Sequence, residues 1–306
     1  MKAIRIAAFG SADVLTLKEI ERPACGANDV VIKVGASGVN PIEWKIRSGA
    51  MAGVLARLLP VTLGWECAGI IVEIGPDVDH WKLGDNVFAL TDFSRDGTHA
   101  EYIATDARNV APKPVSLSYE QAATVPMTAQ AAWSVLEAAA LTAGQSVLIH
   151  GAGGSVGHWL IQFAKQAGLH VTGTASTADL ETISALGCDD VIDYRNQRFE
   201  DAGTFDAVAD LVGGETQERS WGVIVRGGRL VSLAAPLAPE REGVRGLFVF
   251  TQPRGSVLTK ISALLDSGAL VPLPVKTQLP LSKAKLIHEL GESGKSGKSV
   301  LTVASL

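Results

Sequence analysis

Two patterns of apolar residues divide the chain near residue 126. Up to about residue 110, short β-branched runs such as 30–34, 69–74 and 86–90 alternate with glycine and proline turns. Runs of this kind predict a β-rich, barrel-like region. Beyond Pro126, apolar runs of strand length alternate with amphipathic segments of helical length, which predicts a parallel sheet covered on both faces. The sequence therefore predicts an α/β protein built from two parts.

The second part has enough elements for a complete dinucleotide-binding sheet. Strands are expected at residues 146–150, 169–174, 190–193, 205–211, 229–233 and 246–250, and six parallel strands make a full Rossmann sheet. Helices are expected from the glycine-rich turn to Ala167, and over about 177–186, 256–267 and 282–290. We assign residues 122–252 to the Rossmann domain, and residues 1–121 with 253–306 to the β-rich domain.

The most specific motif is the glycine-rich turn between the first of these strands and its helix, which reads His150-Gly151-Ala152-Gly153-Gly154-Ser155-Val156-Gly157. Glycines allow a sharp turn and let backbone N–H groups approach a pyrophosphate, while the helix amino terminus adds unpaired donors and a favourable dipole. We therefore predict cofactor binding at Gly151, Gly153, Gly154, Ser155, Val156 and Gly157. The alternative is a turn that uses glycine for its geometry only.

The end of the second strand bears on the choice between NAD and NADP. An acidic residue there would bind the ribose 2′-hydroxyl and repel a 2′-phosphate, but no acid follows this strand before Asp179. Thr174, Ser176 and Tyr194 are candidate phosphate partners, so NADPH is expected. Ser176 is equally well explained as a helix N-cap with Asp179 three residues on, and Asp179 itself argues against a nearby phosphate.

Composition narrows the class of protein. Apolar residues make up 47% of the 306 residues and the net charge is −5, which suits a folded protein and offers no basic face for nucleic acid or anionic lipid. No apolar run is long enough for a membrane span or a signal peptide. Three scattered cysteines do not suggest a disulfide framework. We expect a cytoplasmic protein with reduced thiols.

The chain resembles a known family, the zinc-independent medium-chain dehydrogenases/reductases that include the quinone oxidoreductases related to zeta-crystallin. The matching segments are 38–45, 63–69, 84–88, 97–102, the glycine turn, 192–194 and 227–232. The resemblance implies a GroES-like β-rich catalytic domain beside the Rossmann domain, and a homodimer formed through the edge strand at 246–250. It also implies that Asn40 lies beside the nicotinamide and the acceptor carbonyl, and that Ser232, Phe248 and Lys298 lie near the cofactor.

The same resemblance bears on zinc and on the reaction. Relatives with catalytic zinc have ligands at positions matching Asn40, Trp65 and Met127, and none of these three is a normal zinc ligand. We therefore expect no metal site of this type. Without a Lewis acid, a conjugated acceptor is an easier substrate than a simple alcohol. The predicted activity is NADPH-dependent hydride transfer to quinones or to activated alkenes such as enones.

Several points leave alternatives open. Ala131 stands where relatives usually carry threonine, so the nearby Thr128 is the candidate proton donor. Asn40 also fits a turn asparagine before proline, Lys298 fits a solvated charge, and His99 is expected at the surface or between domains. An apolar stripe of Met51, Leu55, Leu58 and Leu59 fits packing or the edge of a pocket. The alternative functions are an enoyl-thioester reductase and a cofactor-binding protein of low turnover with a structural role.

Overall fold

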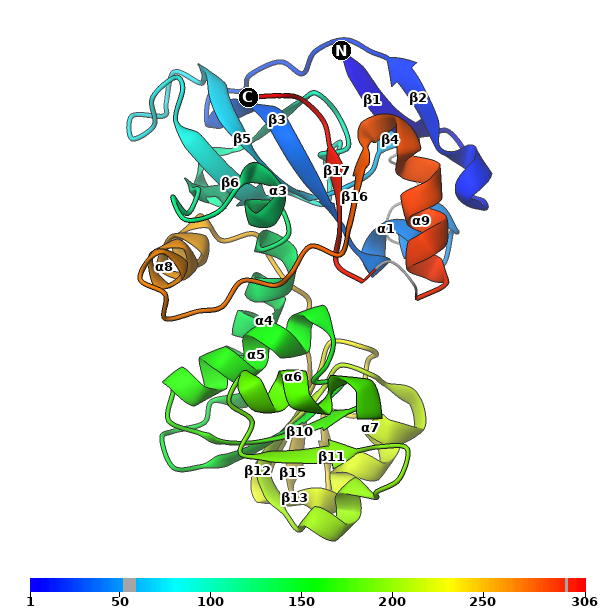
Figure 1. Ribbon diagram of the computed structural model, residues 1–306, viewed down its shortest axis with the longest axis vertical. Helices are drawn as coiled ribbons and strands as arrows, with labels where there is room; N and C mark the ends of the chain where they lie inside the picture. Colours follow the sequence, from blue (N-terminus) through cyan, green and yellow to red (C-terminus); the bar gives the residue numbers. More distant parts are fainter. Residues whose placement is uncertain (52–58, 295–296) are drawn as a thin grey trace. The chain divides into compact units, whose positions relative to one another are not determined.

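The computed structural model describes residues 1–51, 59–294 and 297–306. Its contacts divide the chain into two compact units (Figure 1), a β-rich unit of Met1–Met127 with Gln252–Leu306 and a Rossmann unit of Thr128–Thr251. The first of these boundaries lies six residues after the predicted one, which is between 121 and 122. Leu55 and Leu58 of the apolar stripe lie outside the described residues.

The Rossmann unit is built on one sheet with the strand order β11-β10-β9-β12-β13-β15-β14. Every neighbouring pair is parallel except β14 with β15. The six parallel strands follow the Rossmann order, and the six predicted strands are confirmed. The strands are β9 (Ser146–His150), β10 (His170–Ala175), β11 (Asp190–Asp193), β12 (Phe205–Asp210), β13 (Ile224–Ser232), β14 (Glu240–Arg241) and β15 (Val244–Phe248).

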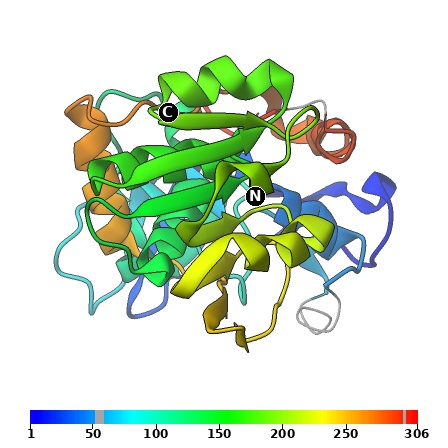
Figure 2. The same ribbon diagram turned by 90° about the horizontal axis from the view of Figure 1, so that it is seen from below.

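Helices cover both faces of this sheet (Figure 2). In α5, Trp159, Leu160 and Phe163 are buried at helical spacing, and Gly168 follows the helix with a φ of +74°. The helix expected over 177–186 forms as a 3-10 turn followed by a short α-helix. The helical segments are α4 (Pro126–Ala139), which crosses the unit boundary, α5 (Ser155–Gln166), η4 (Thr177–Asp179), α6 (Leu180–Ala185), η5 (Phe199–Ala202), α7 (Gly214–Ser220) and η6 (Trp221–Val223).

The β-rich unit contains a large sheet, antiparallel except for the parallel pair β16 and β17, and a smaller antiparallel sheet. The large sheet has the order β16-β17-β3-β5-β6-β8, with β7 also paired to β3, and the small sheet has the order β2-β1-β4. Val30, Ile32 and Ile71 belong to the apolar core of the large sheet. The strands are β1 (Lys2–Ile6), β2 (Thr16–Glu19), β3 (Asp29–Val39), β4 (Val61–Thr62), β5 (Glu66–Ile74), β6 (Asn86–Leu90), β7 (Tyr102–Asp106), β8 (Val110–Pro112), β16 (Thr277–Pro280) and β17 (Ser299–Thr302).

A second core of the β-rich unit lies around α1 and α9. It contains Ile46 from α1, Leu63 and Trp65 from the segment before β5, and Ile287 from α9. No helix in the described ranges is long and apolar enough to cross a bilayer. The helical segments of this unit are η1 (Ala12–Val14), α1 (Pro41–Arg47), η3 (Ala107–Asn109), α3 (Tyr119–Ala122), α8 (Gly255–Asp266), η7 (Leu281–Lys283) and α9 (Ala284–Glu292).

Candidate functional site

The glycine turn connects β9 to α5 in a conformation that only glycine fits. Gly151 has a φ of +71°, a region that residues with a Cβ rarely adopt. A Cβ on Gly153 would lie 2.9 Å from the Cβ of Asp179, and one on Gly157 would lie 2.4 Å from the Ala152 carbonyl oxygen. The first-turn N–H groups of α5, which starts at Ser155, have no partner within their own helix. The turn therefore presents backbone donors to an anion.

A cavity of about 480 Å³ adjoins this turn at the carboxyl ends of the strands. This volume falls within the usual range of small-molecule sites, and the position is where open parallel sheets bind ligands. The lining residues come from β9, β10, β11 and α7 and from the loops that follow these strands: His150, Gly151, Thr174, Ile192, Tyr194, Gln197, Phe199, Val212, Thr216 and Arg219. Thr174 and Tyr194, two predicted phosphate partners, are thus brought together.

The polar side chains around the cavity are held by local bonds. His150 Nδ1 lies 3.1 Å from the Thr174 hydroxyl, and the His150 ring meets Phe199 edge-on at 4.6 Å. Burial lowers the pKa of His150 to about 4, so this imidazole is neutral at physiological pH. Tyr194 is 58% exposed, and its ring stacks with Arg195 at 6.0 Å.

Ser176 precedes η4 but does not cap it with its side chain. Its hydroxyl instead donates to Asp179 Oδ2 at 2.6 Å. The cap explanation of Ser176 is therefore correct in position and wrong in its hydrogen bond. Asp179 also lies beside Gly153, so a carboxylate does approach the glycine turn.

The ends of β12 and β13 carry a second polar group. Ser232 is fully buried, and its hydroxyl donates to Asp210 Oδ2 at 2.8 Å. Gln217 from α7 donates to both residues. Phe248 ends β15 and is 47% exposed. The hydroxyl of Ser232 is occupied by protein partners, so only the backbone around it is left to meet a ligand.

In the β-rich unit, three side chains far apart in sequence meet around Asn40. Lys298 Nζ donates to Asn40 Oδ1 at 2.7 Å and to Glu66 Oε1 at 2.6 Å, while Asn40 Nδ2 donates to Glu66 Oε1 at 2.7 Å. Lys298 is 5% exposed and Glu66 is fully buried. The solvated-charge explanation of Lys298 is therefore wrong. Gly38 allows this packing, because a Cβ there would lie 2.2 Å from Glu66 Oε1.

These contacts settle which way the Asn40 amide points. A lysine ammonium only donates and a carboxylate only accepts, so Oδ1 faces Lys298 and Nδ2 faces Glu66. In the described part of the chain, Glu66 takes one of the two Nδ2 hydrogens, which leaves the other for a ligand. The backbone is fixed as well, because Asn40 precedes α1 and its N–H donates to Glu43 Oε2 at 2.5 Å. Asn40 is thus a buried hydrogen-bond donor with a fixed orientation.

Glu43 and Glu66 complete the charge balance of this group. Burial, together with the nearby Glu66 carboxylate, raises the pKa of Glu43 to about 8. Glu66 Oε2 accepts the N–H of Met127 at 2.8 Å, so it also holds the start of α4. Sequence reasoning missed Glu66 although it lies within a quoted motif. The available signal was an acid at the start of an apolar strand run, since a buried carboxylate requires partners.

Three other residues that the sequence singled out are buried: Thr128, Trp65 and His99. Thr128 is buried, and its hydroxyl oxygen accepts from Trp159 Nε1 at 3.0 Å. Trp65 is fully buried and packs against Phe93. The expectation that His99 lies at the surface or between domains is wrong: it is fully buried inside the β-rich unit, with Nδ1 2.8 Å from the Ser37 hydroxyl. The preceding turn had suggested exposure, but the loop folds inward.

A metal site requires a particular arrangement of ligand side chains. Within residues 1–51, 59–294 and 297–306, no group of three or more His, Cys, Asp or Glu side chains is arranged to hold a metal ion.

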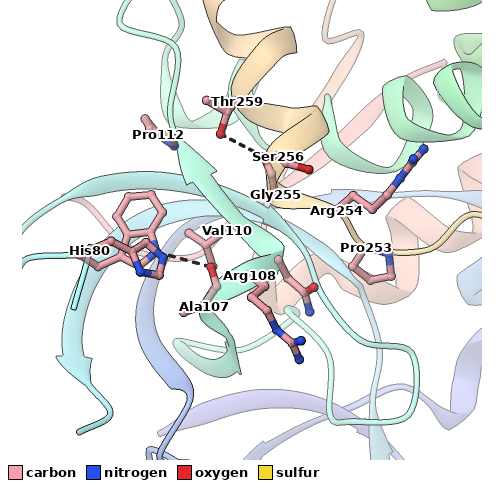
Figure 3. A pocket seen from close by; sticks show the side chains of 12 residues that line it. His80, Ala107, Arg108, Val110, Pro112, Pro253, Arg254, Gly255, Ser256 and Thr259 are labelled. Carbon is pink, nitrogen blue, oxygen red and sulfur yellow. Dashed lines mark hydrogen bonds between the residues drawn. The ribbon is translucent and has the colours of Figure 1, made fainter. Parts of the chain in front are cut away.

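A hollow of about 810 Å³ in the β-rich unit lies between the 80–81 loop, β8 and the start of α8 (Figure 3). Trp81 donates there to the Ala107 carbonyl at 3.4 Å. None of the predicted site residues lines this hollow.

Sequence comparisons place the chain among known reductases. Residues 26–115 match the model of the alcohol dehydrogenase GroES-like domain, and residues 186–301 match that of zinc-binding dehydrogenases. The 2-methylene-furan-3-one reductase of Solanum lycopersicum is 35% identical over 98% of this chain and 79% of that protein. The chloroplastic NADPH-dependent alkenal/one oxidoreductase of Arabidopsis thaliana is 34% identical with the same coverage. The human quinone oxidoreductase is 30% identical over 98% and 97% of the two chains.

Solved structures agree over nearly the whole chain. The quinone oxidoreductase from Coxiella burnetii has a TM-score of 0.92 and 33% identity, covering 99% of both chains. The CurK enoyl reductase has a TM-score of 0.89 and 27% identity, again covering 99% of both. The Escherichia coli quinone oxidoreductase complexed with NADPH has a TM-score of 0.85 and 26% identity, covering 99% of this chain and 100% of that one. The chain therefore belongs to the medium-chain dehydrogenase/reductase family and has the GroES-like and Rossmann architecture of its quinone oxidoreductases.

Proposed function

We propose that this protein is an NADPH-dependent reductase that passes a hydride to quinones or enones and needs no zinc. The observation that carries the proposal is the Asn40 amide, which Lys298 and Glu66 hold as a hydrogen-bond donor. A preorganised donor in a buried place stabilises the negative charge that develops on an acceptor carbonyl oxygen. This is the role that a metal Lewis acid has elsewhere.

Residues of the Rossmann unit would bind the cofactor, and residues of the β-rich unit would bind the acceptor. NADPH, when bound, supplies the hydride for the electron-poor carbon of the acceptor. The glycine turn and the first turn of α5 would hold its pyrophosphate, and the cavity at Thr174 and Tyr194 would receive its adenosine half. Asn40 would donate to the acceptor carbonyl oxygen, and the buried Lys298 ammonium would lower the cost of negative charge there. Thr128 remains the predicted proton donor, with its oxygen held by Trp159.

NADPH titration and quinone turnover test this proposal. NADPH and NADH are titrated by quenching of tryptophan fluorescence, and the loss of NADPH absorbance is then followed after addition of a p-quinone or an enone. Asn40→Leu should leave the Kd for NADPH near the wild-type value and lower kcat by about 100-fold, the effect of removing one preorganised donor. An unchanged kcat in Asn40→Leu would overturn the assigned role of Asn40. Failure of the wild-type protein to bind either nucleotide would overturn the proposed function.

The preference for NADPH is supported by residues at and beyond the carboxyl ends of β10 and β11. Thr174 lines the cavity and no acid follows before Asp179, whose carboxylate accepts from the Ser176 hydroxyl. Tyr194, a largely exposed residue, lines the same cavity and carries a hydroxyl. A Kd for NADPH at least tenfold below that for NADH is the expected result, because a charge-assisted hydrogen bond to phosphate contributes about 1.5–3 kcal/mol. Equal Kd values would contradict the assignment.

Independence from zinc is supported by what surrounds the corresponding positions. The Asn40 amide is held between Lys298 and Glu66, and the Trp65 indole N–H donates to the Arg95 carbonyl at 3.4 Å. Activity should therefore survive exhaustive dialysis against a strong chelator. Loss of activity that added Zn²⁺ restores would reject this part of the proposal.

A cytoplasmic location stays a prediction, since the names of curated relatives include a chloroplastic protein.

Reduction of an enoyl thioester is the second candidate, favoured by the likeness to the CurK enoyl reductase. The same buried Asn40 donor would serve a thioester carbonyl, so the acceptor is the only difference between the two activities. Assays with a short enoyl thioester beside the quinone distinguish them by kcat/KM. Tight NADPH binding without turnover on any acceptor would instead indicate the low-turnover binding role.

We also propose a homodimer. Its contact would not be a simple continuation of the Rossmann sheet from one molecule into the next. β14 pairs with the first residues of β15, through Glu240 with Arg245 and Arg241 with Val244, and so covers part of the outer edge. Phe248 and Phe250 beyond this covered part are 47% and 45% exposed. These two aromatic side chains would form the apolar centre of the contact. Gel filtration at about twice the 32.0 kDa chain mass is expected, and a monomer would reject the dimer.

A further inference from the structure

Asp210 is a buried carboxylate with a full set of donors. It ends β12 and is fully buried. Its Oδ1 accepts the N–H groups of Val212 and Gly213 at 3.0 and 2.7 Å, and its Oδ2 accepts from the Ser232 hydroxyl at 2.8 Å and from Gln217 Nε2 at 3.0 Å. A buried charge is tolerated when its lone pairs are satisfied in this way. Asp210 therefore fixes the two loops that follow β12 and β13.

Gln217 extends this network to the backbone. The residue lies on α7 and is 5% exposed. Besides Asp210, its Nε2 lies 3.0 Å from the Ser232 hydroxyl and 3.1 Å from the carbonyl oxygen of Ala235. The Ser232 hydroxyl in turn accepts the N–H groups of Ala234 and Ala235 at 3.1 and 3.3 Å. One helix side chain thus sets the path of the 232–235 backbone.

The position of this backbone in the sheet indicates what it serves. In the sheet register His150, the residue before the glycine turn, lies opposite Asp210, and Asp210 lies opposite Ser232. A dinucleotide with its pyrophosphate on the glycine turn extends one half in each direction along this edge. The cavity at Thr174 and Tyr194 would take the adenosine half; it is lined from β9, β10 and β11 and, beyond β12, by Val212, Thr216 and Arg219. The other half, which carries the nicotinamide, then extends over the ends of β12 and β13.

We propose that Gln217 and Asp210 are positioning residues that hold the 232–235 backbone against the nicotinamide half of the cofactor. This inference rests on the proposed function. It assigns to Gln217 a role without any contact to the cofactor itself. Gln217 does not line the adenosine cavity, although Thr216 and Arg219 on the same helix do. Replacing the Gln217 side chain should therefore weaken binding of the nicotinamide half and leave binding of the adenosine half unchanged.

The test compares two ligands and two variants. Gln217→Leu removes the amide NH2, whose two hydrogens serve the three acceptors within reach, and Glu218→Gln, an exposed neighbour on α7, is the matched control. The Kd values for NADPH and for 2′,5′-ADP, which represents the adenosine half alone, are measured by calorimetry. We expect Gln217→Leu to raise the Kd for NADPH by about tenfold, as the loss of one to two hydrogen bonds would. The Kd for 2′,5′-ADP should not change, and Glu218→Gln should change neither.

A second readout follows the face of the nicotinamide that reacts. With NADPH deuterated on one face at C4, the wild-type protein should transfer one label exclusively, and Gln217→Leu should transfer a mixture. Ser232→Ala, a smaller change in the same network, should show both effects more weakly and serves if Gln217→Leu does not fold. Equal weakening of NADPH and 2′,5′-ADP, or no weakening of either, would overturn the inference. A wild-type protein that binds neither ligand would overturn the proposed function instead.

Discussion

Replacement of Lys298 by methionine should destabilise the β-rich unit far more than replacement of a surface lysine. The Lys298 side chain is 3% exposed and its Glu66 partner is fully buried. Lys298 Nζ lies 2.6 Å from Glu66 Oε1 and 2.7 Å from Asn40 Oδ1. Methionine keeps most of the length and apolar volume of lysine, so the change removes a charge and its donors and leaves the packing largely intact.

The magnitude follows from the carboxylate that is left behind. Breaking a buried ion pair on one side costs about 3–5 kcal/mol, because the remaining charge stays buried without its countercharge. Glu66 keeps two donors, the Met127 N–H at 2.8 Å and Asn40 Nδ2 at 2.7 Å. We therefore expect a loss of about 3 kcal/mol, the lower end of that range. The same change at Lys285, which is half exposed and paired with Asp13, should cost far less stability, because solvent-exposed ion pairs contribute little.

Urea unfolding at neutral pH, followed by tryptophan fluorescence, measures both losses. The double variant Glu66→Gln with Lys298→Met removes both charges, and it should recover at least half of the loss seen in Lys298→Met alone. The reasoning is refuted if Lys298→Met costs no more than Lys285→Met. It is also refuted if the double variant is as unstable as the sum of its single variants, since the two side chains would then not depend on each other.

Three further predictions concern charge and pH. The pKa of Glu43 is raised in the folded state to about 8, so its contribution to stability is complete below about pH 4.5 and is lost as the pH rises to 8. The free energy of unfolding should fall over this range by on the order of 4 kcal/mol because of Glu43, and Glu43→Gln should remove this fall. Burial lowers the pKa of His288 to about 3, so its contribution is complete above the ordinary value near 6.5 and is lost as the pH falls towards 3. In His288→Phe the unfolding free energy should therefore fall less between pH 6.5 and 4 than in the wild-type protein, and an equal fall would contradict the role of this imidazole. Asp179→Asn removes a carboxylate beside the glycine turn and should lower the Kd for NADPH about fivefold at low salt and that for NADH less, because only NADPH adds a 2′-phosphate to the pyrophosphate that both carry; an equal change in both would exclude an effect at the 2′-phosphate.

Most of the sheet of the Rossmann unit was predictable because its inner strands are largely apolar. The run at 146–150 matches β9 residue for residue, since buried parallel strands have apolar residues on both faces. The edge strand β11 (Asp190–Asp193) has only two apolar residues, and its predicted range also matches. β14 was missed for the opposite reason: Glu240 and Arg241 are both exposed and polar, and they pair through the backbone alone. Such pairing leaves no hydrophobic pattern in the sequence.

The candidate site was less accessible to sequence reasoning, because its side chains depend on distant partners. The glycine turn is a local backbone feature and can be read from its own eight residues. Lys298 and Glu66 are 232 positions apart, and neither position alone indicates that the two charges neutralise each other. Gln217 likewise carries no signal by itself, since its three acceptors come from two other strands and loops. Long-range pairing of polar groups is therefore what the structure adds.

The short strand β14 also affects the tendency of this protein to aggregate at high concentration. The outermost strand of an open sheet presents unpaired backbone groups that can add a strand from another molecule, which is a route to aggregation. β14 and the bond from the Gly246 N–H to the Pro239 carbonyl at 2.8 Å occupy those groups at the start of β15. Gly246 permits this close approach, because a Cβ there would lie 1.9 Å from the Ala238 carbonyl oxygen. A change that opened this hairpin would leave the candidate site residues in place and still make the protein more prone to aggregate.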